Sequence, residues 1–84
     1  MAEAVCRVCG WDDGDERWSV QGHPQNVICS ACGSESGVED LNLKSVRAAR
    51  KKWLETGAVW FAPEDRPLTW SADAQLSQVP RAWR

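Results

Sequence analysis

The chain has 84 residues and a net charge of −2, and 43% of its residues are hydrophobic. This composition is ordinary for a globular protein, so it excludes wholesale disorder, and the length allows one small domain. A chain of this size buries little apolar surface, so we expect a disulfide, a metal ion or a partner to add stability. Six tryptophans and one phenylalanine supply the large side chains.

The charge is distributed unevenly along the chain. Residues 1–40 carry eight acidic and two basic side chains, a net of −6, whereas residues 41–84 carry eight basic and four acidic ones, a net of +4. The acidic half disfavours general binding to phosphate groups. The first ten residues lack the features of a secretory signal, and no apolar run reaches the roughly 18 residues of a membrane span. We therefore expect a cytoplasmic protein with no membrane attachment.

Two cysteine pairs form the strongest pattern, Cys-x2-Cys-x19-Cys-x2-Cys, with a glycine after each pair. A two-residue gap lets a tight turn place two sulfurs on one tetrahedron, and the glycine leaves room for backbone N–H groups to approach sulfur. Two such turns predict one structural Zn²⁺ held by four thiolates. The predicted ligands are Cys6, Cys9, Cys29 and Cys32.

The same four sulfurs leave other chemistries open. Iron in a rubredoxin-like electron carrier uses the same ligands, and the sequence alone does not distinguish iron from zinc. Disulfides and a redox-active Cys-x2-Cys pair are further alternatives, although two matched pairs in a chain without a secretory signal favour a metal. His23 precedes a proline and is expected in a turn. Because a closed four-thiolate site has no open position for substrate, we expect no enzyme.

Between the cysteine pairs the sequence predicts β-hairpins. Asp13-Gly14 is typical of a hairpin turn, since both residues tolerate positive φ, and residues 17–21 follow as a strand. The acidic run at residues 12–16 lacks the ligand spacing of a calcium loop, so we interpret it as a solvated hairpin tip or a contact for a basic partner.

A long helix is predicted from Leu43 to Thr56. Asn42 is a suitable N-cap and Gly57 a suitable left-handed C-cap. Residues at helical spacing form one apolar stripe: Leu43, Val46, Ala49 or Arg50, Trp53 and Leu54. The helix therefore presents one side to a core.

The C-terminal part is expected to cover that stripe. One of the adjacent residues Trp60 and Phe61 should point inward, together with Trp70, because neighbours in an extended segment face opposite ways. An exposed tip is expected at Glu64, Asp65 and Arg66. Ser71 is a suitable cap for a short helix from Ala72 to Gln78, which Pro80 ends.

Together these elements predict a small α+β fold. It would consist of a zinc ribbon, that is, rubredoxin-like β-hairpins with two zinc knuckles, followed by one long helix and a short C-terminal helix. Residues 1–40 would form the four-cysteine ribbon, and residues 41–84 a helical, tryptophan-rich part packed on it within a single domain.

The segment "ICSACGSESGVEDLNLKSVRAARKKWLETGAVWFAPEDRPLTW" resembles a family of small bacterial zinc-ribbon proteins. The shared features are the second C-x-x-C-G pair, an ESG-x-ED turn, a helix that ends in W-x-x-x-G-A-x-W-F, and a tail rich in proline and tryptophan. The chain is more distantly similar to cysteine-rich domains with a C-P-C-C motif, whose proline is missing from both pairs here. Because such proteins are often encoded beside secreted bacterial toxins, the resemblance implies an immunity protein.

These observations favour a non-enzymatic protein that binds another protein, and a cationic bacterial toxin is the most specific partner. The expected contacts are the acidic run and two residue types common in interfaces: Asp12, Asp13, Asp15, Glu16, Trp18 and Arg66. The alternative is a nucleic-acid-binding zinc ribbon, in which helix residues Lys44, Arg47, Lys51 and Lys52 face phosphates and tryptophan stacks on bases. An iron-loaded electron carrier is the third hypothesis.

Overall fold

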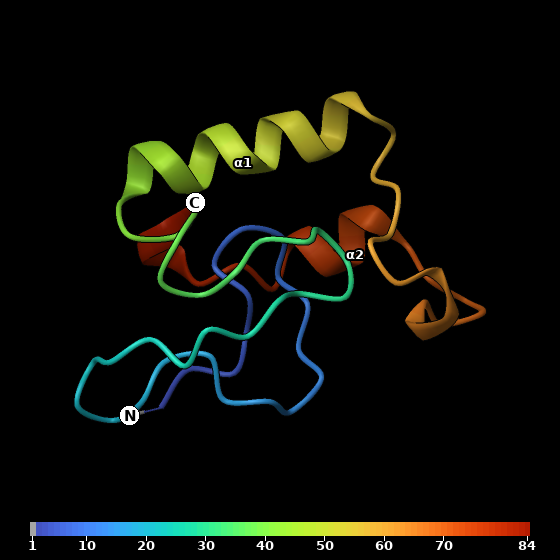
Figure 1. Cartoon of the computed structure of the whole chain (residues 1–84). Coiled ribbons are helices and arrows are strands. Elements are labelled where there is room, and N and C mark those ends of the chain that lie inside the picture. The colour runs from blue at the N-terminus through green and yellow to red at the C-terminus, as the bar shows by residue number, and fades with distance from the viewer. Residues whose placement is uncertain (1) are drawn as a thin grey trace.

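The computed structural model describes residues 2–84, and its main element is α1, an α-helix from Leu43 to Glu55 (Figure 1). A second α-helix, α2, spans Ala72–Leu76, and two 3-10 turns, η1 (Pro63–Asp65) and η2 (Arg81–Trp83), complete the helical structure of the described chain. Figure 1 shows α1 along one side of the molecule, above the loops of the first forty residues, with the C-terminus near the beginning of α1.

The predicted β-hairpins do not occur in the described residues, so the expectation of an α+β zinc ribbon was wrong. The backbone pairs only at isolated bridges, which join Glu3 with Trp18, Trp18 with Pro24, and Ile28 with Glu35. Residues 17–21 form no strand. The cysteine-bearing part is instead a set of consecutive turns and loops.

In the cysteine-bearing part, the turns follow one another too closely for the segments between them to form a ladder of backbone hydrogen bonds. Three glycine N–H groups each donate to a carbonyl oxygen three or four residues earlier, at 2.9 Å: Gly10 to Cys6, Gly22 to Ser19 and Gly33 to Cys29. At the expected hairpin turn, the carboxylates of Asp12 and Asp13 each accept a hydrogen bond from the backbone N–H two residues further on. Local side-chain bonds of this kind compete with cross-strand pairing.

Helix α1 begins and ends with the predicted caps. The side chain of Asn42 accepts a 2.9 Å hydrogen bond from the N–H of Ser45. At the other end, the N–H groups of residues 57–58 donate to the carbonyl oxygens of Leu54 and Trp53, which are the two bonds of a Schellman motif. The sequence therefore predicted both ends of α1 to within one residue.

The buried side of α1 is narrower than predicted. Val46 and Trp53 are buried and Ala49 packs against the core, whereas Leu54 is exposed and lies outside the stripe. One helix with so few buried side chains cannot form a core alone. The remainder of the core comes from the cysteine turns and from the C-terminal segment.

Tryptophan side chains form the centre of that core. Trp60 is only 4% exposed, and its ring packs edge to face against Trp11 and Trp70, at centroid distances of 4.8 and 5.9 Å. Its neighbour Phe61 is 64% exposed, which confirms that only one of the two points inward. The predicted tip is exposed at Glu64, Asp65 and Arg66. The core draws on both halves of the chain, and the domain boundary at residue 40 stays a prediction.

Helix α2 packs against the first cysteine turn. Its cap is as predicted, since the Ser71 hydroxyl accepts from the N–H of Ala74 at 3.3 Å, but the helix ends at Leu76, two residues early. A Cβ atom at Gly10 would lie 2.1 Å from the carbonyl oxygen of Gln75. This close approach is possible only because residue 10 has no side chain.

Candidate metal centre

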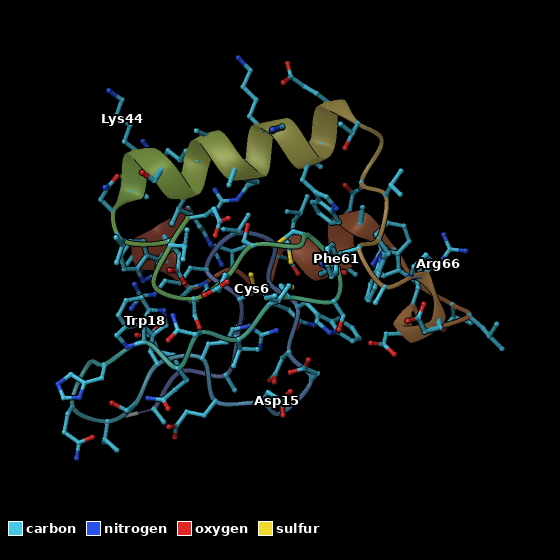
Figure 2. All side chains as sticks on the ribbon, viewed as in Figure 1. Cys6, Asp15, Trp18, Lys44, Phe61 and Arg66 are labelled. Atoms are coloured by element: carbon cyan, nitrogen blue, oxygen red, sulfur yellow. The ribbon has the colours of Figure 1, made fainter. Side chains whose placement is uncertain are left out.

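The four cysteine sulfurs lie together in the interior, and Figure 2 shows Cys6 near the middle of the molecule. All four Sγ atoms lie within 4.8 Å of one another; Cys6 is 3.7 Å from Cys32, and Cys9 is 3.6 Å from Cys29. Zn–S bonds of about 2.3 Å in a tetrahedron place sulfurs about 3.8 Å apart. The donor set and its spacing therefore fit a four-thiolate metal site, which either zinc or iron can occupy.

Two matching turns produce this arrangement. In each, the N–H of the glycine that follows the pair bonds the carbonyl oxygen of the first cysteine. Val8 and Ala31, which stand just before the second cysteine of each pair, are both 0% exposed. Each turn is thus anchored in the core by its own side chain. Gly10 and Gly33 have φ values of +86° and +76°, which other residues adopt only with strain.

The sulfurs are shielded from solvent and influence one another. Cys6, Cys9 and Cys29 are buried, Cys32 is half-buried, and none of them forms a disulfide within residues 2–84. Hydrogen bonds with Cys32 and Cys6 lower the pKa of the Cys29 thiol, whereas the hydrogen bond with Cys29 raises the pKa of the Cys9 thiol. A divalent ion binds cysteines as thiolates, so it displaces the protons that the four sulfurs carry.

Two arginines hold the first cysteine turn: Arg7 is part of the turn itself, and Arg50 bonds to its backbone from α1. Arg50 of α1 donates from Nε to the carbonyl oxygen of Val8 at 2.6 Å, and from Nη2 to that of Arg7 at 2.9 Å. Burial lowers the pKa of Arg50, and repulsion from Arg47 lowers it further. These two hydrogen bonds join residues more than forty positions apart, so no local sequence pattern predicts them.

Arg7 lies between two tryptophan rings. Its guanidinium carbon is 3.9 Å from the ring centroid of Trp18 and 4.1 Å from that of Trp83. The same group forms a two-pronged ion pair with Glu3, at 2.8 and 2.7 Å, and donates to the carbonyl oxygen of Asp40 at 3.0 Å. Stacked cations and bidentate carboxylate pairs are arrangements that arginine favours. The end of the chain is thereby attached to the first cysteine turn.

The predicted partner-binding residues occupy different environments. The acidic loop, residues 12–16, has four acidic residues that are exposed as a whole, Asp12, Asp13, Asp15 and Glu16. The side chain of Asp13, which pairs with Arg17, is only 25% exposed. Trp18 is only 7% exposed, and its indole N–H donates to the buried Asp40 carboxylate at 2.9 Å, which leaves little of its surface for a partner. Arg66 is exposed, 5.7 Å above the ring of Trp70. Figure 2 places Asp15, Trp18 and Arg66 on separate parts of the molecule.

Other features of the sequence lie apart from the cysteines. His23 is exposed and does not belong to the cysteine group. Within residues 2–84, no helix combines the length and apolar character that crossing a membrane requires. Comparisons with known protein families, with curated proteins and with solved structures find no match to this chain. The cysteine group fits a cysteine-rich metal-binding domain, whereas the resemblance to toxin-associated proteins has no family match behind it.

Proposed function

We propose that this chain is a non-enzymatic, protein-binding protein whose fold depends on one structural zinc ion. The observation that supports this most is the group of four cysteine sulfurs within 4.8 Å of one another. Four thiolates leave the metal no position for water or substrate, so its role is to hold the surrounding turns in place. Cysteines that form no disulfide within the described chain suit a reducing compartment such as the cytoplasm.

The identity of the metal is tested first, on protein purified from medium that contains both zinc and iron. We expect a colourless solution with one zinc per chain by elemental analysis. A red protein with one iron per chain would instead support the electron carrier, because a four-thiolate iron site can change its oxidation state whereas zinc cannot.

The acidic loop is the surface that we propose for the partner. Its acidic residues are exposed, and Figure 2 shows Asp15 at the periphery of the molecule. Charge on an exposed loop accelerates encounter with a surface of opposite sign. The proposed partner is therefore a protein with a basic binding surface, and a cationic bacterial toxin is its most specific form.

The binding experiment reverses two charges of the loop, Asp15→Lys with Glu16→Lys. These two side chains make no hydrogen bond or ion pair within the described chain, whereas Asp13 pairs with Arg17 at 3.3 Å and is left intact. A partner captured on the immobilised zinc-loaded chain is identified by mass spectrometry, purified and titrated calorimetrically. At low salt we expect the double variant to bind the partner at least about tenfold more weakly than the unaltered chain does, because the loop charges steer a basic surface toward the chain.

The matched control is Glu64→Lys with Asp65→Lys, which makes the same change of charge at the exposed turn η1. If both double variants bind as the unaltered chain does, the acidic loop is not the interface. For the toxin itself, the test is co-expression with the candidate toxin. Failure to restore growth, together with failure to form a complex, would remove the immunity role and leave the metal site unaffected.

A nucleic acid is the second candidate partner, because one surface of α1 is basic. Lys44, Arg47, Lys51 and Lys52 are all exposed, and Figure 2 shows Lys44 projecting away from the helix. Anisotropy of labelled short oligonucleotides at about 150 mM salt tests this reading. Binding that persists there, and that Lys44→Glu with Lys51→Glu abolishes, would favour nucleic acid over a protein partner.

A further inference from the structure

The four cysteines of the metal centre are not equally accessible. Cys6 is 4% exposed, and Cys9 and Cys29 are 0% exposed. Cys32, the last of the four along the chain, is half-buried. The reactivity of a cysteine toward a reagent in solution depends on its exposure as well as on its chemical form, so the four sulfurs should not react alike.

A surface cavity lies beside Cys32. It has a volume of about 400 Å³, and its lining includes Cys32 together with the aromatic residues Trp53, Trp60 and Phe61. Lys52 and Phe61, which are exposed residues, also line the cavity, so it opens to solvent. Hydrogen peroxide and small organic electrophiles are much smaller than this space. The cavity therefore gives such molecules an approach to one edge of the cysteine group.

Phe61 lies over the turn that carries Cys32. Its backbone N–H donates to the carbonyl oxygen of Ala31 at 3.0 Å, which holds the segment after α1 against the second cysteine turn. Its ring packs on Gly33, since a Cβ atom at that glycine would lie 3.0 Å from the ring carbon Cδ1. Because Phe61 is itself 64% exposed, it covers this turn only in part.

We propose that Cys32 is the modification site of the metal centre, the sulfur that small electrophiles and hydroperoxides attack first, with Phe61 as its partial cover. Metal binding keeps each cysteine as a thiolate, which is the nucleophilic form, so the accessible ligand is the reactive one. The inference rests on the metal centre of the proposed function and is independent of the partner.

Two kinds of reagent react at the Cys32 sulfur. With iodoacetamide, the sulfur forms a bond to carbon and iodide leaves. With a hydroperoxide, the sulfur bonds the terminal peroxide oxygen as the O–O bond breaks. The sulfur is oxidised by two electrons to a sulfenic acid, and the hydroxide or alkoxide that leaves takes a proton from water.

A second cysteine completes the oxidation. The Cys6 sulfur lies 3.7 Å from that of Cys32 and is placed to attack the sulfenic sulfur. An S–S bond then forms, the S–O bond breaks, and the departing hydroxide takes a proton from water. The chain keeps two thiolates, too few for a four-thiolate site, so oxidation is expected to release the metal.

The test treats the zinc-loaded chain with iodoacetamide to low conversion, denatures it, and labels the remaining thiols with heavy-isotope iodoacetamide. Tandem mass spectrometry locates the cysteine that reacted first. We expect Cys32 to carry several-fold more of the light label than any other cysteine. Equal labelling of all four, or earlier labelling of a buried cysteine, would overturn the proposal.

Variants test the cover that Phe61 provides. Phe61→Ala removes the ring and is expected to accelerate the labelling of Cys32 several-fold, with near-UV circular dichroism to establish that the variant is folded. Leu68→Ala, at an exposed residue that does not line the cavity, is the control and should leave the rate unchanged. If Phe61→Ala does not fold, Phe61→Leu replaces it. An unaltered rate in a folded variant overturns the role of Phe61.

Oxidation supplies a second measurement on the unaltered chain. Hydrogen peroxide is expected to produce a disulfide between Cys6 and Cys32 and to release zinc, which a chromophoric chelator detects. Zinc release with a first disulfide that lacks Cys32 would contradict the proposal.

Failure of this inference is distinguishable from failure of the metal centre. A chain that elemental analysis finds without zinc or iron removes the metal centre and this inference with it. A chain with one zinc, whose four cysteines are labelled alike, retains the metal centre and loses only the role of Cys32.

Discussion

The guanidinium of Arg50, in the third turn of α1, donates a 2.6 Å hydrogen bond to the carbonyl oxygen of Val8, which stands between Cys6 and Cys9. The helix is therefore attached to the backbone of a cysteine turn by a charged group. Because the same side chain also reaches the carbonyl oxygens of Arg7 and Trp83, it joins the first turn, the helix and the end of the chain.

Replacing Arg50 by methionine is expected to destabilise the zinc-loaded protein by about 2–4 kcal/mol, because carbonyl oxygens in the interior lose a charged donor. Urea unfolding followed by circular dichroism measures the change. Lys51→Met, at the exposed neighbouring position, is the control and should alter stability by no more than about 0.5 kcal/mol. Equal effects of the two substitutions would mean that the Arg50 contacts contribute little.

Removal of the metal is expected to unfold the chain. The tetrathiolate site can contribute on the order of 10 kcal/mol, more than a core of this size supplies. A strong chelator, or Cys29→Ser, should abolish near-UV circular dichroism and the dispersion of the NMR spectrum. Ser30→Ala, in the same turn, should leave both intact. A dispersed spectrum from Cys29→Ser would contradict a structural role for the metal.

Alanine at Gly10 is expected to be far more destabilising than alanine at Gly14. The two glycines have almost the same φ, +86° and +87°, so the cost of backbone strain is shared. Only Gly10 has a neighbour where the new Cβ would lie, the carbonyl oxygen of Gln75 at 2.1 Å, and nothing lies within 4 Å at Gly14. The difference in unfolding free energy should be at least about 2 kcal/mol, since backbone must move. Similar unfolding free energies for the two alanine variants would show that α2 can move away from residue 10 at little cost.

Lysine at position 7 is not expected to preserve the stability that the contacts of Arg7 provide. An ammonium group cannot form the two-pronged pair with Glu3 while stacking between Trp18 and Trp83. We expect a loss of about 2 kcal/mol in unfolding free energy. Denaturation of the zinc-loaded protein monitors the loss, with Arg81→Lys as the control at an exposed site. An unaltered midpoint for Arg7→Lys would mean that the charge alone is sufficient.

Some features were predictable because they depend on short sequence distances. The Asn42 cap, the bonds of residues 57–58 at the helix end, and the Ser71 cap all involve neighbours within five positions. The opposite orientation of Trp60 and Phe61 follows from backbone alternation in an extended segment. Local bonds also account for the prediction that was wrong. Where cross-strand pairing was expected, the side chains of Asp12 and Asp13 instead accept bonds from the backbone two residues further on, and no hairpin forms in the described residues.

The sequence by itself determined that four cysteines stand in two matched turns, where one helix lies and how it is capped. Only the tertiary structure decided what surrounds the cysteines. Trp18, expected at an interface, is buried against Asp40, and Arg50 of α1 donates to the backbone of the first cysteine turn from more than forty positions away. A local pattern fixes backbone conformation through bonds between near neighbours, whereas a cation can pair with any anion, carbonyl or ring that folding brings within reach.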